Sequence, residues 1–183
     1  MTGRPTLVVV SGPPGSGKTT LAHALARTVG CPAICRDEIK EGMVHARTGF
    51  VPGPGDELTR RALPTFFAVL ELLLRAGVTT VAEAAFQDRV WRPALQRLDG
   101  LARLRIVHCR VDARVAWQRI SRRQADPVRR AHADTELVDE AAYAARHHGF
   151  ERVSIAAPAI EVDTTDGYAP DLAAIAAFVT APG

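Results

Sequence analysis

Short apolar runs alternate with longer amphipathic stretches along the chain. Five runs rich in Val, Ile, Leu and Ala predict buried strands, at residues 6–10, 33–35, 78–82, 104–109 and 160–162. Stretches with apolar positions at helical spacing predict helices, at residues 19–29, 38–48, 58–75, 89–98, 113–125, 135–147 and 171–179. Strands that alternate with helices are typical of one α/β domain with a parallel sheet.

Two segments interrupt this alternation. Residues 49–56 combine prolines with glycines, which predicts an irregular loop. Residues 126–133 are polar and rich in arginine, and they predict a break between two helices. The arginine-rich break is therefore the candidate for a moving piece of the domain.

Composition and charge fit a globular domain. The length of 183 residues suits a single domain that spans residues 1–183. A hydrophobic content of 47% and a charged content of 23% argue against disorder. The net charge of +3 does not require a nucleic-acid partner, although it leaves one open. Without a membrane-length apolar run or a signal peptide, we expect a cytoplasmic protein with no membrane partner.

The cysteines do not indicate a disulfide framework. The sequence has three cysteines, an odd number with irregular spacing: Cys31, Cys35 and Cys109. Cys31 and Cys35 have the form of half a metal site, but no second Cys/His pair matches them. We therefore expect no metal bound by these cysteines.

The segment between the first predicted strand and the first predicted helix carries the strongest motif. It matches G-x-x-x-x-G-K-[ST] in full, with Gly12, Pro13, Pro14, Gly15, Ser16, Gly17, Lys18 and Thr19, and Thr20 follows it in the helix. Backbone N–H groups of such a loop turn inward around phosphate oxygens, and the helix N-terminus adds its positive dipole end. We expect Lys18 to reach the β- and γ-phosphates of a nucleoside triphosphate and the Thr19 hydroxyl to bind Mg²⁺.

Carboxylates are predicted near this phosphate loop. Asp37 directly follows the second strand, and the carboxyl ends of parallel strands face the ligand crevice. Asp37 is therefore a candidate general base for an attacking hydroxyl, with a helix cap as the alternative. We expect Lys40 either to bind a substrate anion or to be a solvated lysine. Glu83 ends the third strand, and we expect it either to meet Mg²⁺ through water or to touch the acceptor.

Arg89 follows in the next helix. It is a candidate for the wall of the acceptor pocket, with a solvated helix face as the alternative.

Arginines gather before and within the arginine-rich break, which predicts a lid over residues 119–134. Arg119 and Arg123 lie four residues apart, hence on one helix face, with Arg122 as a rival for the second position. Such arginines would close over the nucleotide and neutralise charge on the transferred phosphoryl group. A basic helix end favoured by the macrodipole and a nucleic-acid groove are the alternatives, and the latter lacks interleaved aromatics.

The phosphate loop, the segment CRDEIKEGM and the arginine-rich break together resemble a family. They look like the P-loop kinases that include polynucleotide 5′-hydroxyl kinases, chloramphenicol phosphotransferase and zeta-toxin-like kinases. The resemblance implies a three-layer α/β fold with strand order 2-3-1-4-5. It implies Asp37 as the base, Arg119 and Arg123 in the lid, and Thr164 and Thr165 beside the adenine. Polynucleotide kinases usually carry arginine where Lys40 stands, which weakens that particular reading.

The expected function is transfer of the γ-phosphoryl group of ATP to a hydroxyl, with Mg²⁺ as cofactor. A small metabolite or antibiotic is the first choice of acceptor, because the chain is short and its net charge modest. A polynucleotide 5′-hydroxyl kinase is the first alternative. A nucleotide-hydrolysing switch protein is the second.

Overall fold

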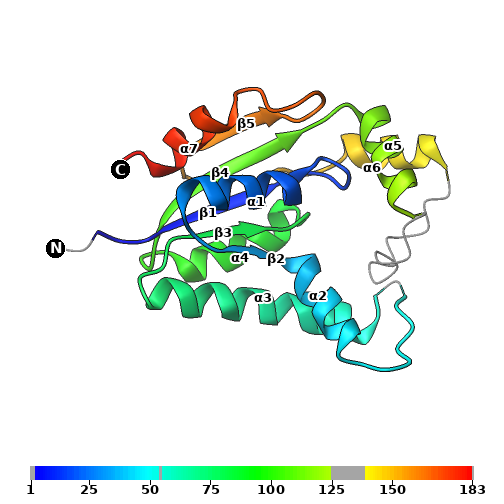
Figure 1. The fold of residues 1–183 in the computed structure, drawn as a ribbon, viewed down its shortest axis with the longest axis horizontal. Coiled ribbons are helices and arrows are strands. Elements are labelled where there is room, and N and C mark those ends of the chain that lie inside the picture. The colour runs from blue at the N-terminus through cyan, green and yellow to red at the C-terminus, as the bar shows by residue number, and fades with distance from the viewer. Residues whose placement is uncertain (1–2, 54, 125–138, 183) are drawn as a thin grey trace.

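A parallel sheet of five strands forms the centre of the protein (Figure 1). The computed structural model describes residues 3–53, 55–124 and 139–182. The strands are β1 (Thr6–Ser11), β2 (Ala33–Cys35), β3 (Thr80–Glu83), β4 (Arg103–Arg110) and β5 (Ala159–Asp163). Their order in the sheet is β2-β3-β1-β4-β5, and every described pair is parallel. The predicted α/β fold class and strand order are therefore confirmed.

Helices cover both faces of this sheet (Figure 1). They are α1 (Lys18–Val29), α2 (Arg36–His45), α3 (Glu57–Arg75), α4 (Asp88–Leu98), α5 (Ala113–Gln124), α6 (Glu140–His148) and α7 (Leu172–Thr180). Helices α1 and α7 pack on one face, and α3 and α4 pack on the other. None of the helices in the described part of the chain has the length and apolarity that a membrane span requires.

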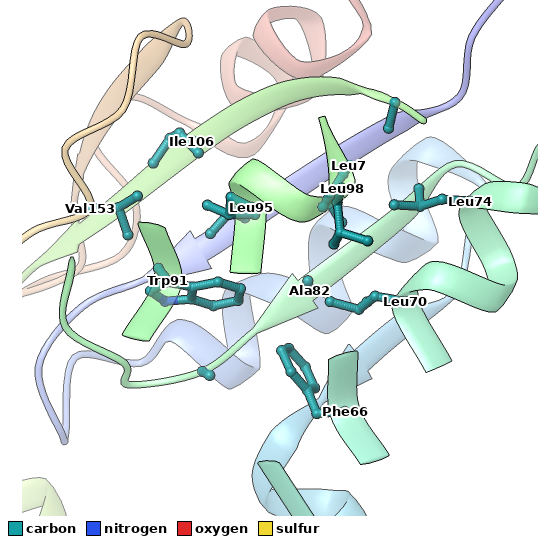
Figure 2. Close-up of a cluster of buried hydrophobic side chains, with 13 residues drawn as sticks. Leu7, Phe66, Leu70, Leu74, Ala82, Trp91, Leu95, Leu98, Ile106 and Val153 are labelled. Carbon is teal, nitrogen blue, oxygen red and sulfur yellow. The ribbon is translucent and has the colours of Figure 1, made fainter. Parts of the chain in front are cut away.

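The interior of strand β1, residues 7–10, is apolar because the strand faces helices on both sides. Leu7 and Val9 belong to the cluster on the α3/α4 face, whereas Val8 and Val10 belong to the cluster on the α1/α7 face. Successive side chains of a strand point to opposite faces, so a central parallel strand has no polar side. Figure 2 shows the first cluster, in which the Phe66 ring of α3 meets the Trp91 ring of α4 with centroids 5.7 Å apart.

Helix α2 starts earlier than the sequence pattern predicts. The prediction placed it at residues 38–48, but it spans Arg36–His45 and follows β2 without a connecting loop. Cys35 is the last extended residue, with φ −104° and ψ 123°. Asp37 therefore lies in the first turn of α2, at the carboxyl edge of the sheet, rather than in a loop before the helix.

The loop before α3 ends in a strong helix cap. Asp56 accepts hydrogen bonds from the backbone N–H groups of Thr59 and Gly53, at 2.7 and 3.0 Å. These bonds satisfy N–H groups that would otherwise lack a partner at the helix start. At the far end, Gly77 adopts φ +77°, a conformation that glycine takes without steric cost, and the helix stops there.

Helices α5 and α6 form a small third cluster beside the phosphate loop. Its buried members are Val111, Ala116, Ile120 and Tyr143. The prediction for residues 113–125 agrees with α5, and Asp112 caps it by accepting from the N–H groups of Arg114 and Val115. The arginine-rich break at 126–133 and residues 135–138 of the next predicted helix lie outside the described residues. Helix α6 begins at Glu140, behind the cap residue Asp139.

Candidate active site

The candidate site lies at the carboxyl ends of β1, β2 and β3. Glu83 is the register partner of Val10 in β1 and of Cys35 in β2. The phosphate loop (residues 12–19) leaves β1 immediately after this level, and α2 leaves β2 from the same level. The topology of the sheet therefore brings the phosphate loop, Glu83 and the first turn of α2 together.

Close approach of other backbone explains two glycines of the phosphate loop. A Cβ on Gly12 would lie 2.6 Å from the carbonyl oxygen of Cys109, and one on Gly15 would lie 2.7 Å from that of Ala116. Gly15 also has φ +76°, where L side chains are strained. The glycines thus let the loop pack against the end of β4 and against α5.

Lys18, Thr19 and Glu83 converge at the centre of the site. The Lys18 Nζ atom lies 3.7 Å from Glu83 Oε1, and the Thr19 hydroxyl donates to Glu83 Oε2 at 3.0 Å. Glu83 is 1% exposed. Burial raises the pKa of the Glu83 carboxyl above its usual value, and the nearby charge of Asp37 adds to the rise, while Lys18 and Thr19 oppose it. A buried carboxylate in this setting favours a bound cation.

The donor set at this point fits Mg²⁺. The Thr19 hydroxyl and the Glu83 carboxylate are hard oxygen donors, the kind that Mg²⁺ prefers. Among the described residues, the buried Ser16 hydroxyl inside the phosphate loop has no hydrogen-bond partner. An unpaired hydroxyl in a loop of inward N–H groups fits a site that takes phosphate oxygens.

Asp37 lies in the first turn of α2, at the sheet edge where Glu83 also lies. It is half exposed, and Arg36 Nη1 lies 2.9 Å from its Oδ1 atom. Arg36 is itself anchored by donating to the Thr59 carbonyl oxygen at 3.0 Å. Asp37 follows Cys35, the register partner of Glu83, so both carboxylates lie at the same edge of the sheet, and the charge of Asp37 adds to the raised pKa of Glu83. The structure therefore brings Asp37, Glu83 and the phosphate loop together, as the sequence led us to expect.

Lys40 has a partner that the sequence analysis did not identify. It is buried, and its Nζ atom lies 2.9 Å from Asp56 Oδ2, so the solvated alternative is wrong. Burial raises the pKa of Asp56, but hydrogen bonds from Thr59 and Gly53 and the contact with Lys40 outweigh it and hold that pKa well below its usual range. The pair ties α2 to the start of α3. The sequence analysis placed Asp56 only at the end of the irregular loop 49–56.

Arg119 closes the opposite side of the phosphate loop. Its Nη2 atom donates to the carbonyl oxygens of Thr164 and Thr165, at 2.7 and 3.1 Å, and Nη1 donates to that of Gly15 at 3.5 Å. The Thr164 hydroxyl donates to the Ser16 carbonyl oxygen at 2.7 Å. The end of β5, the phosphate loop and α5 are thereby joined.

A cavity of about 420 Å³ opens beside Arg119. It is lined by Gly17, Thr20, Arg119, Arg122, Arg123, Thr164, Gly167 and Tyr168. The predicted nucleotide-binding residues Thr20, Arg119 and Thr164 thus meet at one cavity, and Arg122 and Arg123 both reach it. Thr165 is turned away from this cavity, since its hydroxyl accepts from the Asp112 N–H group. Residues 125–134 of the predicted lid lie outside the described part of the chain.

Three other predicted positions are less central. Arg89 is exposed in the first turn of α4. This exposure agrees with a solvated helix face, the alternative to a place in the acceptor pocket. Pro13 is buried within the phosphate loop, whereas Pro14 is exposed, and the Pro14 carbonyl oxygen accepts a hydrogen bond from the Tyr143 hydroxyl at 2.6 Å.

Tyr143 and His147 of α6 brace the phosphate loop, a role that the sequence did not reveal. Tyr143 donates to Pro14 and also lies 3.3 Å from His147 Nδ1, while His147 Nε2 lies 3.0 Å from the Val111 carbonyl oxygen. Burial raises the pKa of Tyr143 to about 12 and lowers that of His147. His147 is half-buried with Nε2 donating to the Val111 carbonyl oxygen, whereas the neighbouring His148 is exposed.

Replacing Tyr143 with phenylalanine is expected to loosen the phosphate loop without emptying the cluster around the ring. Loss of one buried hydrogen bond costs about 1 kcal/mol, which corresponds to a fall in Tm of roughly 2–4 °C for a domain of this size. Thermal unfolding with and without nucleotide measures the effect. Tyr168→Phe is the matched control, and an equal fall in both variants would contradict the bracing role of Tyr143.

Comparisons with known proteins agree with this fold and site. The sequence model of the AAA domain matches residues 7–153, so the chain belongs to this family. No curated protein matches the sequence. Among solved structures, a protein from Chloroflexus aurantiacus j-10-fl that has been assigned as a kinase is similar, with 24% identity, 97% of each chain covered and a TM-score of 0.84.

Two further similar structures are an RNA repair complex and a gluconokinase. The Pnkp1/Rnl/Hen1 RNA repair complex has 18% identity and a TM-score of 0.57, with 82% of this chain and 48% of that chain covered. A gluconokinase from Sinorhizobium meliloti 1021 has 19% identity and a TM-score of 0.56, with 96% and 89% covered. Likeness at these identities shows the fold. The resemblance to the P-loop kinase group is confirmed at that level.

Proposed function

We propose that the chain is a Mg²⁺-dependent phosphotransferase that moves the γ-phosphoryl group of ATP to a hydroxyl of a small-molecule acceptor. The observation that carries this proposal is the convergence of Lys18 and Thr19 of the phosphate loop on the buried carboxylate Glu83. Similar structures that are kinases support the phosphotransferase class. We include in the proposal that residues 1–183 act as one domain and that the protein works in the cytoplasm, where ATP is supplied.

The phosphate loop and its neighbours would hold the nucleotide. Backbone N–H groups of residues 12–19 would surround the β-phosphate, and Lys18 would reach the β- and γ-phosphates. The Thr19 hydroxyl would bind Mg²⁺ directly, with Glu83 holding a water ligand behind it. This role for Glu83 is favoured over contact with the acceptor, because Glu83 is bonded to Thr19 and is almost fully buried. Bound Mg²⁺ neutralises charge on the phosphates.

Asp37 would act as the general base. Its carboxylate would accept the proton of the acceptor hydroxyl while the hydroxyl oxygen forms its bond to the γ-phosphorus. The bond from phosphorus to the β–γ bridging oxygen breaks in the same step, and ADP leaves. Asp37 lies on the β2/β3 side of the phosphate loop, and the cavity beside Arg119 lies on the other side. This separation supports an acceptor site and a nucleotide-base site that flank the loop.

Arg119 would form one wall of the nucleotide-base site. Its planar guanidinium is held by carbonyl oxygens on either side of the cavity and is suited to stack on a purine. Arg123, with Arg122 as its rival, would approach the phosphoryl group when the lid closes. In this arrangement the role of Arg119 is to bind the nucleotide more than to clamp the transition state.

Replacement of Arg119 with alanine is expected to raise the KM for ATP by at least 10-fold, because both the stacking surface and the ties to the Thr164 and Thr165 carbonyl oxygens are lost. Arg119 is partly buried, and truncation of an arginine anchored at a binding site costs ~2 kcal/mol or more. Steady-state kinetics with varied ATP measure the change. Arg114→Ala on the same helix is the control, and an unchanged KM in Arg119→Ala would contradict the assignment.

The burial of Lys40 and its ion pair with Asp56 favour a small acceptor over a nucleic acid. Lys40 stands where polynucleotide kinases usually carry arginine, and its ammonium group is buried against Asp56 rather than directed to a phosphate. A polynucleotide 5′-hydroxyl kinase remains the second candidate, supported by the similarity to the RNA repair complex.

The acceptor class is tested with γ-labelled ATP, Mg²⁺ and two separate pools of acceptors. One pool holds hydroxylated small molecules, including sugars, nucleosides, aminoglycosides and phenicols, and the other holds 5′-hydroxyl DNA and RNA oligonucleotides. We expect label on a member of the first pool. Label on oligonucleotide ends, together with oligonucleotide binding that weakens steeply with salt, would replace the small-molecule assignment with the second candidate.

A further inference from the structure

Three side chains with metal-ligating atoms meet on the outer side of the β2–α2 junction. His23 comes from α1, Cys35 ends β2, and Glu38 lies in the first turn of α2. Their ligand atoms all lie within 4.8 Å of one another. The geometry points to a binding site for Zn²⁺ formed by His23, Cys35 and Glu38, with water in the fourth position. Cys35 also neighbours Glu83 of the nucleotide site, whereas His23 and Glu38 belong to this cluster alone, and the zinc proposal does not depend on the proposed function.

The distances suit a tetrahedral zinc ion. With Zn–S near 2.3 Å and Zn–N near 2.0–2.1 Å, tetrahedral geometry sets the S···N separation at about 3.6 Å. The distance from Cys35 Sγ to His23 Nε2 is 3.7 Å. His23 Nε2 and Glu38 Oε1 are 2.6 Å apart and would have to separate to about 3.3 Å. Both side chains are partly exposed, at 38% and 45%, so they have room for this movement.

Acceptor groups outnumber protons around the Cys35 sulfur. The carboxylates of Glu83 and Glu38 both lie beside the Cys35 sulfur, and a thiol has one proton to donate. Burial and these carboxylates raise the pKa of the Cys35 thiol above its usual value. Zinc binding would release this proton to solvent and form the Zn–S bond, while the proton on His23 Nε2 moves to Nδ1 through solvent. The added positive charge would offset the carboxylates.

The mixture of sulfur, nitrogen and oxygen donors distinguishes this site from the one for Mg²⁺. Thiolate and imidazole ligands select Zn²⁺, whereas Mg²⁺ prefers oxygen ligands. The sequence offered Cys31 and Cys35 as a pair, but the described structure joins Cys35 with His23 and Glu38 instead. Cys31 is a free, partly exposed thiol outside the cluster.

Titration of the chelator-treated full chain with Zn²⁺, and with Co²⁺ as a spectroscopic probe, tests the proposal in excess Mg²⁺ and without nucleotide. We expect one equivalent to bind, a thiolate-to-Co²⁺ charge-transfer band, and a rise in Tm of about 5 °C at saturating Zn²⁺. Cys35→Ser should abolish the band and weaken Zn²⁺ binding at least 10-fold. His23→Gln and Glu38→Gln, at partly exposed positions, should each weaken it at least 10-fold.

Cys31→Ser and Arg119→Ala, the latter on the opposite side of the phosphate loop, are the matched controls, and both should bind Zn²⁺ like the parent. The proposal is overturned if the parent shows no thiolate band, if the band survives in Cys35→Ser, or if it is lost in Cys31→Ser. Because none of these readouts uses ATP, failure here leaves the phosphotransferase proposal untouched. A raised KM for ATP in Arg119→Ala with zinc binding retained would separate the two sites.

Discussion

Replacing Asp37 with asparagine is expected to lower the rate of phosphoryl transfer by ~10²–10⁴-fold, the range that loss of a general base produces. The amide keeps the size of the side chain but cannot accept the proton of the acceptor hydroxyl. The KM for ATP should stay within about twofold of the parent, because Asp37 lies on the acceptor side of the phosphate loop. Initial rates of product formation at saturating ATP and acceptor measure the change.

Glu41→Gln is the control for Asp37→Asn. It makes the same change from carboxylate to amide one turn further along α2. Its transfer rate should remain near that of the parent. If Asp37→Asn also kept a rate within a few-fold of the parent, Asp37 would not be the base.

Replacing Glu83 with glutamine is expected to lower kcat by ~10²–10³-fold, a loss similar to that of other electrostatic groups at a reacting phosphoryl. The carboxylate that would hold the Mg²⁺ water is removed, and Lys18 loses its buried partner. The free energy of unfolding should also fall, because breaking a buried ion pair leaves one charge without compensation. Rates over a range of Mg²⁺ concentrations and thermal unfolding of the same samples measure both effects.

The pH dependence gives an independent test of Glu83. Its pKa is raised by burial, so its proton is bound more readily than on an exposed glutamate as pH falls. The parent should therefore lose Mg²⁺-dependent activity on the acid side, as pH falls through this raised pKa. Glu83→Gln should lack that acid limb, and Glu83→Asp, which keeps the charge, should retain it. The same acid limb in parent and Glu83→Gln would assign it to another group.

The sheet could be predicted because its strands are buried on both faces. Val8 and Val9 face different helices, so β1 is a continuous apolar run, and the glycine-rich motif after it marks the first turn. The carboxyl edge then places Lys18, Asp37 and Glu83 together by topology alone. These parts of the site depend on local sequence and on one rule about parallel sheets.

Contacts between segments far apart in the chain were not predictable. The partner of Lys40 is Asp56, which ends the irregular loop before α3 and caps that helix in the structure. Tyr143 reaches Pro14 across 129 residues of sequence. His23, Cys35 and Glu38 have no metal-binding spacing, because they come from three elements that meet only in the folded sheet. Such pairs depend on how helices pack, which periodicity does not specify.

Product analysis from γ-labelled ATP tests the central claim most directly. ADP, inorganic phosphate and labelled product are counted in Mg²⁺, with and without the pool of hydroxylated small molecules, for the parent and for Asp37→Asn. If the chain transfers the phosphoryl group, labelled product and acceptor-dependent ADP should form in equal amounts, and both should fall by about 100-fold or more in Asp37→Asn. Release of inorganic phosphate alone, at a rate unchanged by any acceptor and by Asp37→Asn, would contradict the claim and favour a nucleotide-hydrolysing switch.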